Sequence, residues 1–281
     1  MKKIAIIPND IKDTGLIQTK RIIDCLSGRV KLYMPSNYSV VGGNINYVTL
    51  AELYASADAA IVLGGDGTII QTAAMCAEND VPVMGVNLGR IGFLAEIETD
   101  CIEAAAEKLL NGDYTIEERM MIKAEIIKNN CTTAVCNALN DIVISKTLEE
   151  KLIHIGLYSN DELVNSYAAD GLIISTPTGS TGYSISAGGP VVDPSMALYV
   201  ATPICAHMLS ARSAVLSADK VIEIKIDSEI CGNKAVVTAD GDVREYISDS
   251  DSIRISKSKY KFKLIKTIKQ SFYETLLNKL N

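Results

Sequence analysis

The first hundred residues alternate between two patterns of hydrophobic and polar positions. Short apolar runs, typical of strands, are separated by segments whose apolar residues recur at helical spacing. The strand-like runs are at 3–7, 30–34, 59–63 and 81–86, and the helix-like segments are at 16–26 and 67–77. The run at 59–63 is apolar throughout, as in a strand buried on both faces. This order predicts an N-terminal α/β domain with a parallel, Rossmann-like sheet of βαβ units.

After one more helix-like segment at 102–110, the period changes to two. Apolar and polar residues alternate in four stretches, at 121–126, 153–158, 222–227 and 253–256. Repeated alternation with polar turns between the stretches predicts a mainly antiparallel β-sandwich. The last stretch, 270–280, returns to helical spacing. We therefore expect an α/β domain over 1–100 and a β-rich domain over 101–267, with residues 268–281 as a candidate to pack back on the first domain.

The composition is that of a globular protein with a sizeable core, since 48% of the 281 residues are hydrophobic and 22% are charged. The net charge of −7 argues against non-specific binding to nucleic acid, which needs a concentrated basic surface. No stretch approaches the roughly 18 apolar residues of a membrane span, and the apolar N-terminal run is too short for a signal peptide. Seven scattered cysteines without a C-x-x-C pair favour reduced thiols. We expect a soluble, cytoplasmic protein without nucleic-acid or membrane partners.

A first glycine loop, Gly64-Gly65-Asp66-Gly67-Thr68, lies between the buried strand and the next helix. Ligands of parallel sheets bind at the carboxyl ends of strands, and the N–H groups at a helix start suit phosphate. We expect the glycines to let the backbone approach phosphate oxygens and to adopt positive φ. The Asp would repel phosphate, so its presence favours a proton acceptor or a cation ligand over an ordinary turn. The loop is neither a Walker motif nor a GxGxxG fingerprint.

A second loop, dense in Gly, Ser and Thr, follows the apolar strand 171–175. It runs Thr176-Pro177-Thr178-Gly179-Ser180-Thr181-Gly182-Tyr183-Ser184. Its hydroxyl and N–H groups suit the ribose, phosphates and base edge of a nucleotide, and Tyr183 adds a flat face. A solvent-exposed turn would not need so many small residues, so we favour nucleotide binding.

Together the two loops resemble the NAD kinase family, and the likeness covers most of the chain. The other matching motifs are Asn87-Leu88-Gly89-Arg90-Ile91-Gly92-Phe93-Leu94, Asn140-Asp141 and Pro203-Ile204-Cys205-Ala206-His207-Met208-Leu209. Several motifs in order are more specific than Gly-Gly-Asp-Gly alone, which diacylglycerol and sphingosine kinases share. The resemblance implies that the γ-phosphate of ATP is transferred to the 2'-hydroxyl of the adenosine ribose of NAD, giving NADP and ADP. It makes the first domain nucleotide-binding and the second NAD-binding.

The resemblance also implies a role for each matched position. Asp66 would be the catalytic carboxylate that accepts the proton of the 2'-hydroxyl. Asn140 and Asp141 would bind ribose hydroxyls, and Asp170 would contact the nicotinamide end. The remaining candidate binding residues are Gly65, Gly67 and Thr68 at the phosphates, Phe93 at the adenine region, and Thr181, Gly182, Tyr183, Ser184 and Ser186 along the adenine and the dinucleotide backbone. Mg²⁺ or another divalent cation is expected on the ATP phosphates rather than at a protein metal site, and a homo-oligomer, a dimer or tetramer, is expected.

Some positions depart from the family's commonest pattern, and two other function classes stay open. Asp141 stands where Glu is usual, Gly182 where Ala is usual, Ala168 where a basic residue is frequent, and Asp242 where Gln is common. A lipid kinase with the same first loop would need a membrane-facing apolar surface or a basic patch, and the sequence shows neither. A non-catalytic NAD(P)-binding sensor would keep the fold without turnover, and the intact Asp66 argues against it.

Overall fold

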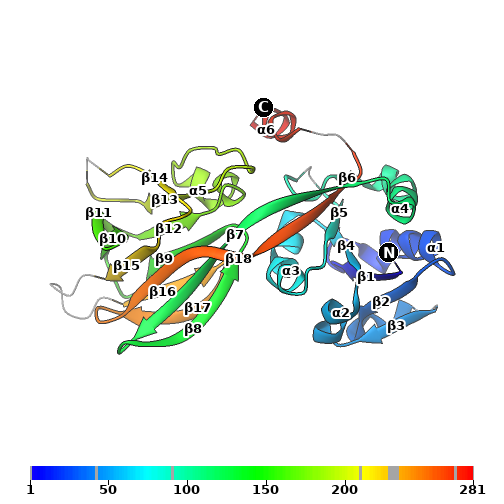
Figure 1. Ribbon diagram of the computed structural model, residues 1–281, viewed down its shortest axis with the longest axis horizontal. Helices are drawn as coiled ribbons and strands as arrows, with labels where there is room; N and C mark the ends of the chain where they lie inside the picture. The colour runs from blue at the N-terminus through cyan, green and yellow to red at the C-terminus, as the bar shows by residue number, and fades with distance from the viewer. Residues whose placement is uncertain are drawn as a thin grey trace. The chain divides into compact units, whose positions relative to one another are not determined.

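The computed structural model describes residues 2–41, 44–89, 92–208, 211–226, 234–268 and 271–280. The chain forms two compact units, unit 1 over Met1–Glu118 and Phe262–Asn281, and unit 2 over Arg119–Lys261. It passes from unit 1 to unit 2 within strand β7 (Thr115–Lys128) and returns within strand β18 (Ser252–Lys266) (Figure 1).

Unit 1 contains the parallel sheet that the apolar runs predict. The strands lie in the order β5-β4-β1-β2-β3, and all of these pairs are parallel. The bounds are β1 (Lys3–Pro8), β2 (Lys31–Pro35), β3 (Ile45–Val48), β4 (Ala59–Gly64) and β5 (Val83–Asn87). The short β6 (Ile97–Glu98) and the end of β18 also pair parallel with β5. Because the chain moves outward from β1 to β3 and then returns to the other side of β1, the strand order reverses between β1 and β4.

Helices cover both faces of this sheet. Helices α1 (Ile17–Leu26) and α4 (Ile102–Asn111) pack together on one face, and α2 (Leu50–Ser56) and α3 (Asp66–Glu78) lie on the other (Figure 1). Alternate residues of the buried strands therefore contact opposite helix layers, which explains why β4 is apolar at every position. Unit 1 also contains the short 3₁₀ helices η1 (Thr14–Leu16), η2 (Ser36–Val41) and η3 (Thr99–Cys101), and the C-terminal helix α6 (Phe272–Leu280).

The observed division of the chain differs from the predicted boundary at residue 100. Helix α4 belongs to unit 1 because it buries Ile102, Ala105 and Leu109 in the same core as α1 and the parallel sheet. The boundary lies inside two long strands, where no break in the hydrophobic pattern marks it. Strand β3 also lacks a clear signal, since it is an edge strand without a fully buried residue. Helix α2 does have one, because Thr49 and Glu52 form a capping box at its start.

Unit 2 is the predicted antiparallel sandwich. One sheet has the order β14-β13-β12-β9-β16-β17, with bounds Ala214–Ser217, Leu198–Ile204, Gly171–Ser175, Asp141–Lys146, Lys234–Ala239 and Asp242–Ser248. The other contains β7, β8 (Cys131–Ala138), β10 (Ile153–Ser159), β11 (Glu162–Ala169), β15 (Ile222–Ile226) and β18. A single core joins them, for example Ile144 and Ile174 of the first sheet with Ile155 and Ile224 of the second. Helices η4 (Gly179–Thr181) and α5 (Tyr183–Ser186) follow β12.

Three hairpins of unit 2 turn through two residues that both have positive φ. These pairs are Asn129-Asn130, Asn160-Asp161 and Asp240-Gly241. Asn, Asp and Gly tolerate the left-handed region, and a turn with two such residues matches the twist of the flanking strands. The hairpin β16–β17 therefore places the Asp240 side chain at a defined position beside the start of β9.

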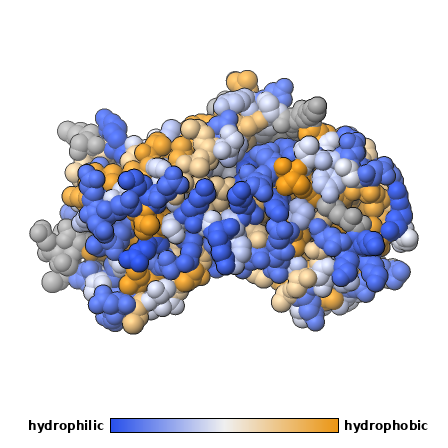
Figure 2. Space-filling view, viewed as in Figure 1, coloured by the Kyte–Doolittle hydropathy of each residue, from blue (hydrophilic) through white to orange (hydrophobic). Residues whose placement is uncertain are grey.

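Among the described residues, no helix has both the length and the apolar character needed to cross a membrane. On the face drawn in Figure 2, hydrophobic residues form separate patches among hydrophilic ones, as is ordinary for globular proteins. The six cysteines within the described ranges are free thiols, as the sequence predicts.

Candidate functional site

The first glycine loop lies at the point where the strand order of the parallel sheet reverses. Gly65 and Asp66 follow β4, and residues 9–13 follow the neighbouring strand β1. Asn9 links the two segments, because its N–H donates to Leu63 O at 2.9 Å and its amide Nδ2 donates to Thr68 Oγ1 at 3.0 Å. Open α/β sheets bind ligands at this position.

Glycine is needed at position 64 of this loop for close approach. A Cβ on Gly64 would overlap the Thr68 side chain, and one on Gly65 would lie 2.8 Å from Lys12 Nζ. The prediction of positive φ is wrong for Gly64, Gly65 and Gly67, which are absent from the left-handed residues. Gly67 is exposed, and the Thr68 hydroxyl is engaged with Asn9. Gly65 and Gly67 thus stand at the start of α3, where N–H groups face outward.

The Asp66 carboxylate is held by three consecutive backbone N–H groups. Phe93 N donates to Oδ2 at 2.8 Å, and Leu94 N and Ala95 N each donate to Oδ1 at 3.0 Å. A Cβ on Gly92 would overlap this carboxylate, so glycine is required there. An ionised carboxylate can accept about four hydrogen bonds. Asp66 therefore keeps one acceptor position, on Oδ2, for a further partner.

Asp66 lines a cavity of about 910 Å³ that two lysines also line. Lys279 Nζ, from α6, lies 3.6 Å from Asp66 Oδ2, and Lys12 lines the same cavity. Lys279 also lies 4.2 Å above the ring of Phe93, whose centroid is 5.6 Å from that of Phe272. The structure thus places Phe93, the predicted adenine contact, against helix α6.

In unit 2, the Asn140-Asp141 motif and the second glycine loop lie side by side. Thr176 N donates to Asn140 O at 2.8 Å, and its Oγ1 donates to Leu139 O at 2.6 Å. A Cβ on Gly179 would overlap the Asn140 backbone, and one on Gly182 would lie 3.4 Å from Asn140 Nδ2. The Asn140 carboxamide oxygen is buried and accepts no hydrogen bond from the described residues.

A second carboxylate, Asp240, organises this motif. It accepts hydrogen bonds from Leu139 N at 2.7 Å, Asn140 N at 2.8 Å and Asp141 N at 3.1 Å. The Asp141 side chain is buried beside it, and this burial, with the nearby charge of Asp240, raises the pKa of Asp141 to about 7. Burial also raises the pKa of Asp240. Protonation of Asp141 near neutral pH relieves the repulsion between the two groups.

The other predicted residues of the second loop differ in exposure. Tyr183 and Ser186 are exposed, and Thr181 is half-buried. Ser184 is fully buried, with its Oγ 3.0 Å from Thr202 Oγ1, so its hydroxyl supports the loop from inside. Tyr183 and Ser186 are thus the side chains of α5 that a ligand can reach.

Asp170 lies apart from these loops. It precedes β12, whereas Thr176 follows that strand, so roughly 20 Å of extended chain separates the two residues. Asp170 forms an ion pair with Lys146, with 2.8 Å between Nζ and Oδ1. Two positions that depart from the family's commonest pattern also lie in strands. Ala168 pairs with His154 in β10–β11, and Asp242 is exposed at the start of β17.

Three residues that the sequence did not single out belong to these sites. Lys12, Lys279 and Asp240 all contact or adjoin predicted site residues. Of these three, Lys12 could have been found from the sequence, because it closely follows a predicted strand whose carboxyl end lies at the ligand-binding edge of the sheet. Arg90, Ile91 and Leu209 of the matching motifs lie outside the described residues. Within the described ranges, no three His, Cys, Asp or Glu side chains are grouped as a metal cluster requires.

A carboxylate beside two lysines, at the switch point of a parallel sheet, is suited to phosphoryl transfer, which depends on positioning and on charge stabilisation. The comparisons with known proteins agree with this class. The family model of the ATP-NAD kinase N-terminal domain matches residues 5–114, and that of the ATP-NAD kinase C-terminal domain matches residues 139–267. The chain belongs to the NAD kinase family, as the sequence motifs predict, and is thus an enzyme of the kinase class that acts on an alcohol group.

Individual relatives cover the whole chain. The NAD kinase of Caldanaerobacter subterraneus subsp. tengcongensis is 40% identical over 284 residues, which is 100% of this chain and 99% of that protein. An NAD kinase from Archaeoglobus fulgidus, solved in complex with ATP, has a TM-score of 0.76 at 25% identity and covers 99% of this chain and 98% of its own. Yeast NADH kinase, solved with NADH, has a TM-score of 0.88 at 22% identity, covers 100% of this chain and 87% of its own, and supports the fold.

Proposed function

We propose that this protein transfers the γ-phosphate of ATP to the 2'-hydroxyl of the adenosine ribose of NAD, giving NADP and ADP. The observation that carries the proposal is the Asp66 carboxylate, which three backbone N–H groups hold and which lines a cavity. A carboxylate is a weak base at neutral pH, so Asp66 acts by being placed to accept the hydroxyl proton as the phosphate is transferred.

In this proposal the loops of unit 2 bind the dinucleotide. The buried oxygen of Asn140 lacks a partner among the described residues, and a buried polar group without one costs about 1–3 kcal/mol. A ribose hydroxyl would supply the missing hydrogen bond. Asp141 would accept from a second hydroxyl, and the exposed Tyr183 and Ser186 would contact the rest of the ligand. Asp170 would bind the nicotinamide end.

Mg²⁺ enters the proposal as part of the Mg–ATP substrate. The described residues offer Asp66 as a single carboxylate in its cavity and no grouped acidic cage. Mg²⁺ is commonly held by substrate phosphates with one or two carboxylates, so this donor set fits an ion that arrives on ATP. We further propose a homo-oligomer in the cytoplasm, which analytical ultracentrifugation and cell fractionation would test.

The direct test is NADP formation from NAD, ATP and Mg²⁺, assayed with an NADP-specific dehydrogenase. Asp66→Asn should lower the rate at least about 100-fold, because the proton acceptor is lost. Asp113→Asn, which alters an exposed carboxylate after α4, should leave the rate unchanged. Circular dichroism would establish that both variants are folded.

Two outcomes would contradict the proposal. Wild-type protein that binds NAD without forming NADP would be a sensor of the dinucleotide. Protein that binds no NAD would direct the same assay to lipid acceptors, the substrates of kinases that share the Gly-Gly-Asp-Gly loop.

A further inference from the structure

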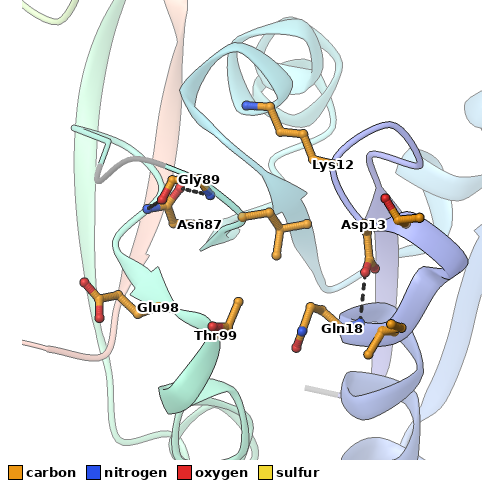
Figure 3. Close-up of a pocket in the computed structure, with 10 residues that line it drawn as sticks. Lys12, Asp13, Gln18, Asn87, Gly89, Glu98 and Thr99 are labelled. Carbon is orange, nitrogen blue, oxygen red and sulfur yellow. Dashed lines mark hydrogen bonds between the residues drawn. The ribbon is translucent and has the colours of Figure 1, made fainter.

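A second cavity of unit 1 adjoins the site already described. It measures about 610 Å³, and it is enclosed by the segment after β1 on one side and by the segments after β5 and β6 on the other (Figure 3). Because it shares Lys12 and Gly89 with the cavity at Asp66, it is an extension of that site. Unit 2 contains a separate feature that has no part in the proposed function, a buried arginine in β7.

This residue, Arg119, is the first of unit 2, and only 4% of it is exposed. Met120 and Ile122 of the same strand belong to the core between the two sheets. Because successive side chains of a strand point to opposite faces, Arg119 points away from that core. A guanidinium stays ionised, and burying a charge is costly unless it is hydrogen-bonded. Apolar packing therefore does not explain why an arginine is buried here.

Arg119 reaches the second glycine loop. Its Nη1 donates to Thr178 Oγ1 at 3.4 Å, and Thr178 is itself buried. Arg119 belongs to the sheet that contains β7, whereas Thr178 follows β12 of the other sheet. The hydrogen bond thus connects the two sheets of the sandwich at the loop, and it joins residues that are 59 positions apart in the sequence.

Other hydroxyl groups of this loop hold its own backbone. Thr176 Oγ1 donates to Leu139 O at 2.6 Å and accepts from Gly179 N at 3.1 Å. Ser180 Oγ donates to Pro177 O at 2.7 Å. Both side chains are fully buried, so they fix the path of the loop from inside.

Thr178 connects Arg119 to a residue that the sequence predicts to bind the nucleotide. Thr181 Oγ1 donates to Thr178 O at 3.3 Å, and Gly182 and Tyr183 follow directly in the chain. Arg119 thus bonds the side chain of Thr178, and the backbone of Thr178 bonds Thr181. Loss of the first bond would free the Thr178 side chain to rotate and would remove a restraint on the turn that carries Thr181.

We propose that Arg119 is a positioning residue for the dinucleotide and that, through Thr178, it holds the second glycine loop in the conformation that binds NAD. This assignment rests on the proposed function, in which the loops of unit 2 bind NAD. A loop that is already held in its binding conformation loses less conformational freedom when the ligand binds. Arg119 therefore acts mainly on the affinity for NAD and little on the rate of phosphate transfer.

The test is isothermal titration calorimetry with NAD in the absence of ATP, together with KM for NAD and kcat from the NADP assay. Thr178→Val removes the hydroxyl that accepts from Arg119. It should raise Kd and KM for NAD about tenfold and leave kcat within about twofold, because one buried hydrogen bond is lost. Thr178→Ser keeps the hydroxyl and should stay within about threefold of the wild type in Kd.

Arg119→Met shows whether the two residues act together. It removes the charge, keeps a long side chain, and should raise Kd for NAD at least about tenfold. If Arg119 acts through Thr178, adding Thr178→Val to Arg119→Met should change Kd by less than about twofold, whereas independent residues would multiply their effects. Circular dichroism establishes which variants are folded, and the Thr178 variants alone decide the question if Arg119→Met is unfolded.

A matched control lies near the other end of the same strand. Thr133 Oγ1 donates to Ile126 O of β7 at 3.3 Å, and Thr133→Val should leave Kd and KM unchanged. A Kd within about twofold of the wild type for Thr178→Val would overturn the proposal. Equal effects of Thr178→Val and Thr133→Val, multiplied effects in the double variant, or a fall in kcat at unchanged KM would overturn it as well.

The measurements separate this assignment from the proposed function. Wild-type protein that binds NAD and forms no NADP contradicts the kinase activity, and the Kd values of the variants still decide the role of Arg119. Unchanged Kd values in variants that form NADP as the wild type does leave the kinase activity standing and overturn the assignment alone.

Discussion

Unit 1 and unit 2 use the same device at their candidate sites, a carboxylate that accepts three hydrogen bonds from consecutive backbone N–H groups. Asp66 holds residues 93–95, and Asp240 holds residues 139–141. In both cases the bond partners are distant in sequence, by 27 to 29 residues for Asp66 and by 99 to 101 for Asp240. Each carboxylate therefore fixes a segment that local structure alone would not fix.

The surroundings of the two carboxylates differ, and with them their chemistry. Asp66 lies beside a cavity with the ammonium of Lys279 3.6 Å away. Asp240 lies beside another carboxyl, Asp141, in a region where burial raises the pKa of both. The same hydrogen-bond pattern thus gives a carboxylate that lines a cavity in one unit and a carboxylate that lies beside a second, buried carboxyl group in the other. The group beside each carboxylate therefore distinguishes the two sites: Lys279 at Asp66, and Asp141 at Asp240.

The largest effect that tests this comparison should come from glycines that contact the two sites. Gly92→Ala places a methyl group on the Asp66 carboxylate and should lower NADP formation about 100-fold, because the acceptor is displaced. In Gly182→Ala the new methyl group would lie 3.2 Å from Gly179 O, a contact that a small shift relieves. Its rate should stay within about threefold of wild type. Equal losses in the two variants would show that Asp66 is not the more sensitive site.

A medium effect is expected for Asp240→Asn. The amide keeps one oxygen, so at least one of the three N–H donors loses its acceptor and faces an NH₂ group. The expected loss in the free energy of unfolding is about 2 kcal/mol, measured by urea denaturation. The KM for NAD should rise more than kcat falls, because Asn140 and Asp141 lose their support. A variant with unchanged stability and KM would rule out the positioning role.

The smallest effect should be a gain in stability for Asp141→Asn at high pH. The pKa of Asp141 is about 7 in the folded protein and about 3.9 when unfolded, so the folded state binds more protons between these values. Wild-type stability from this group is therefore full below pH 4 and is lost as the pH rises through 7. At pH 8 the variant should be more stable than the wild type, and at pH 4 the difference should disappear. Parallel pH profiles for variant and wild type would contradict the assignment of this proton.

The arrangement of the elements was largely predictable from the hydrophobic pattern. The buried strand at 59–63 and the alternating stretch at 153–158 appear as β4 and β10, because burial on two faces or on one leaves a distinct period in the sequence. Strand β3 was not predictable in this way, since its residues are only partly buried. The positive φ expected for Gly64 and Gly65 was also wrong. At Gly64 it is the close approach of the Thr68 side chain, without a left-handed backbone, that requires glycine.

The sequence by itself determined the two fold classes, the family and the motif residues from Gly65 to Ser186, since these depend on local patterns and on order along the chain. Only the tertiary structure decided which residues stand next to one another. Lys279 approaches Asp66, Asp240 holds Asn140, and Lys12 is shared by two cavities. Such contacts join segments that are tens to hundreds of residues apart. Their energies depend on distance in space, and they leave no period in the sequence.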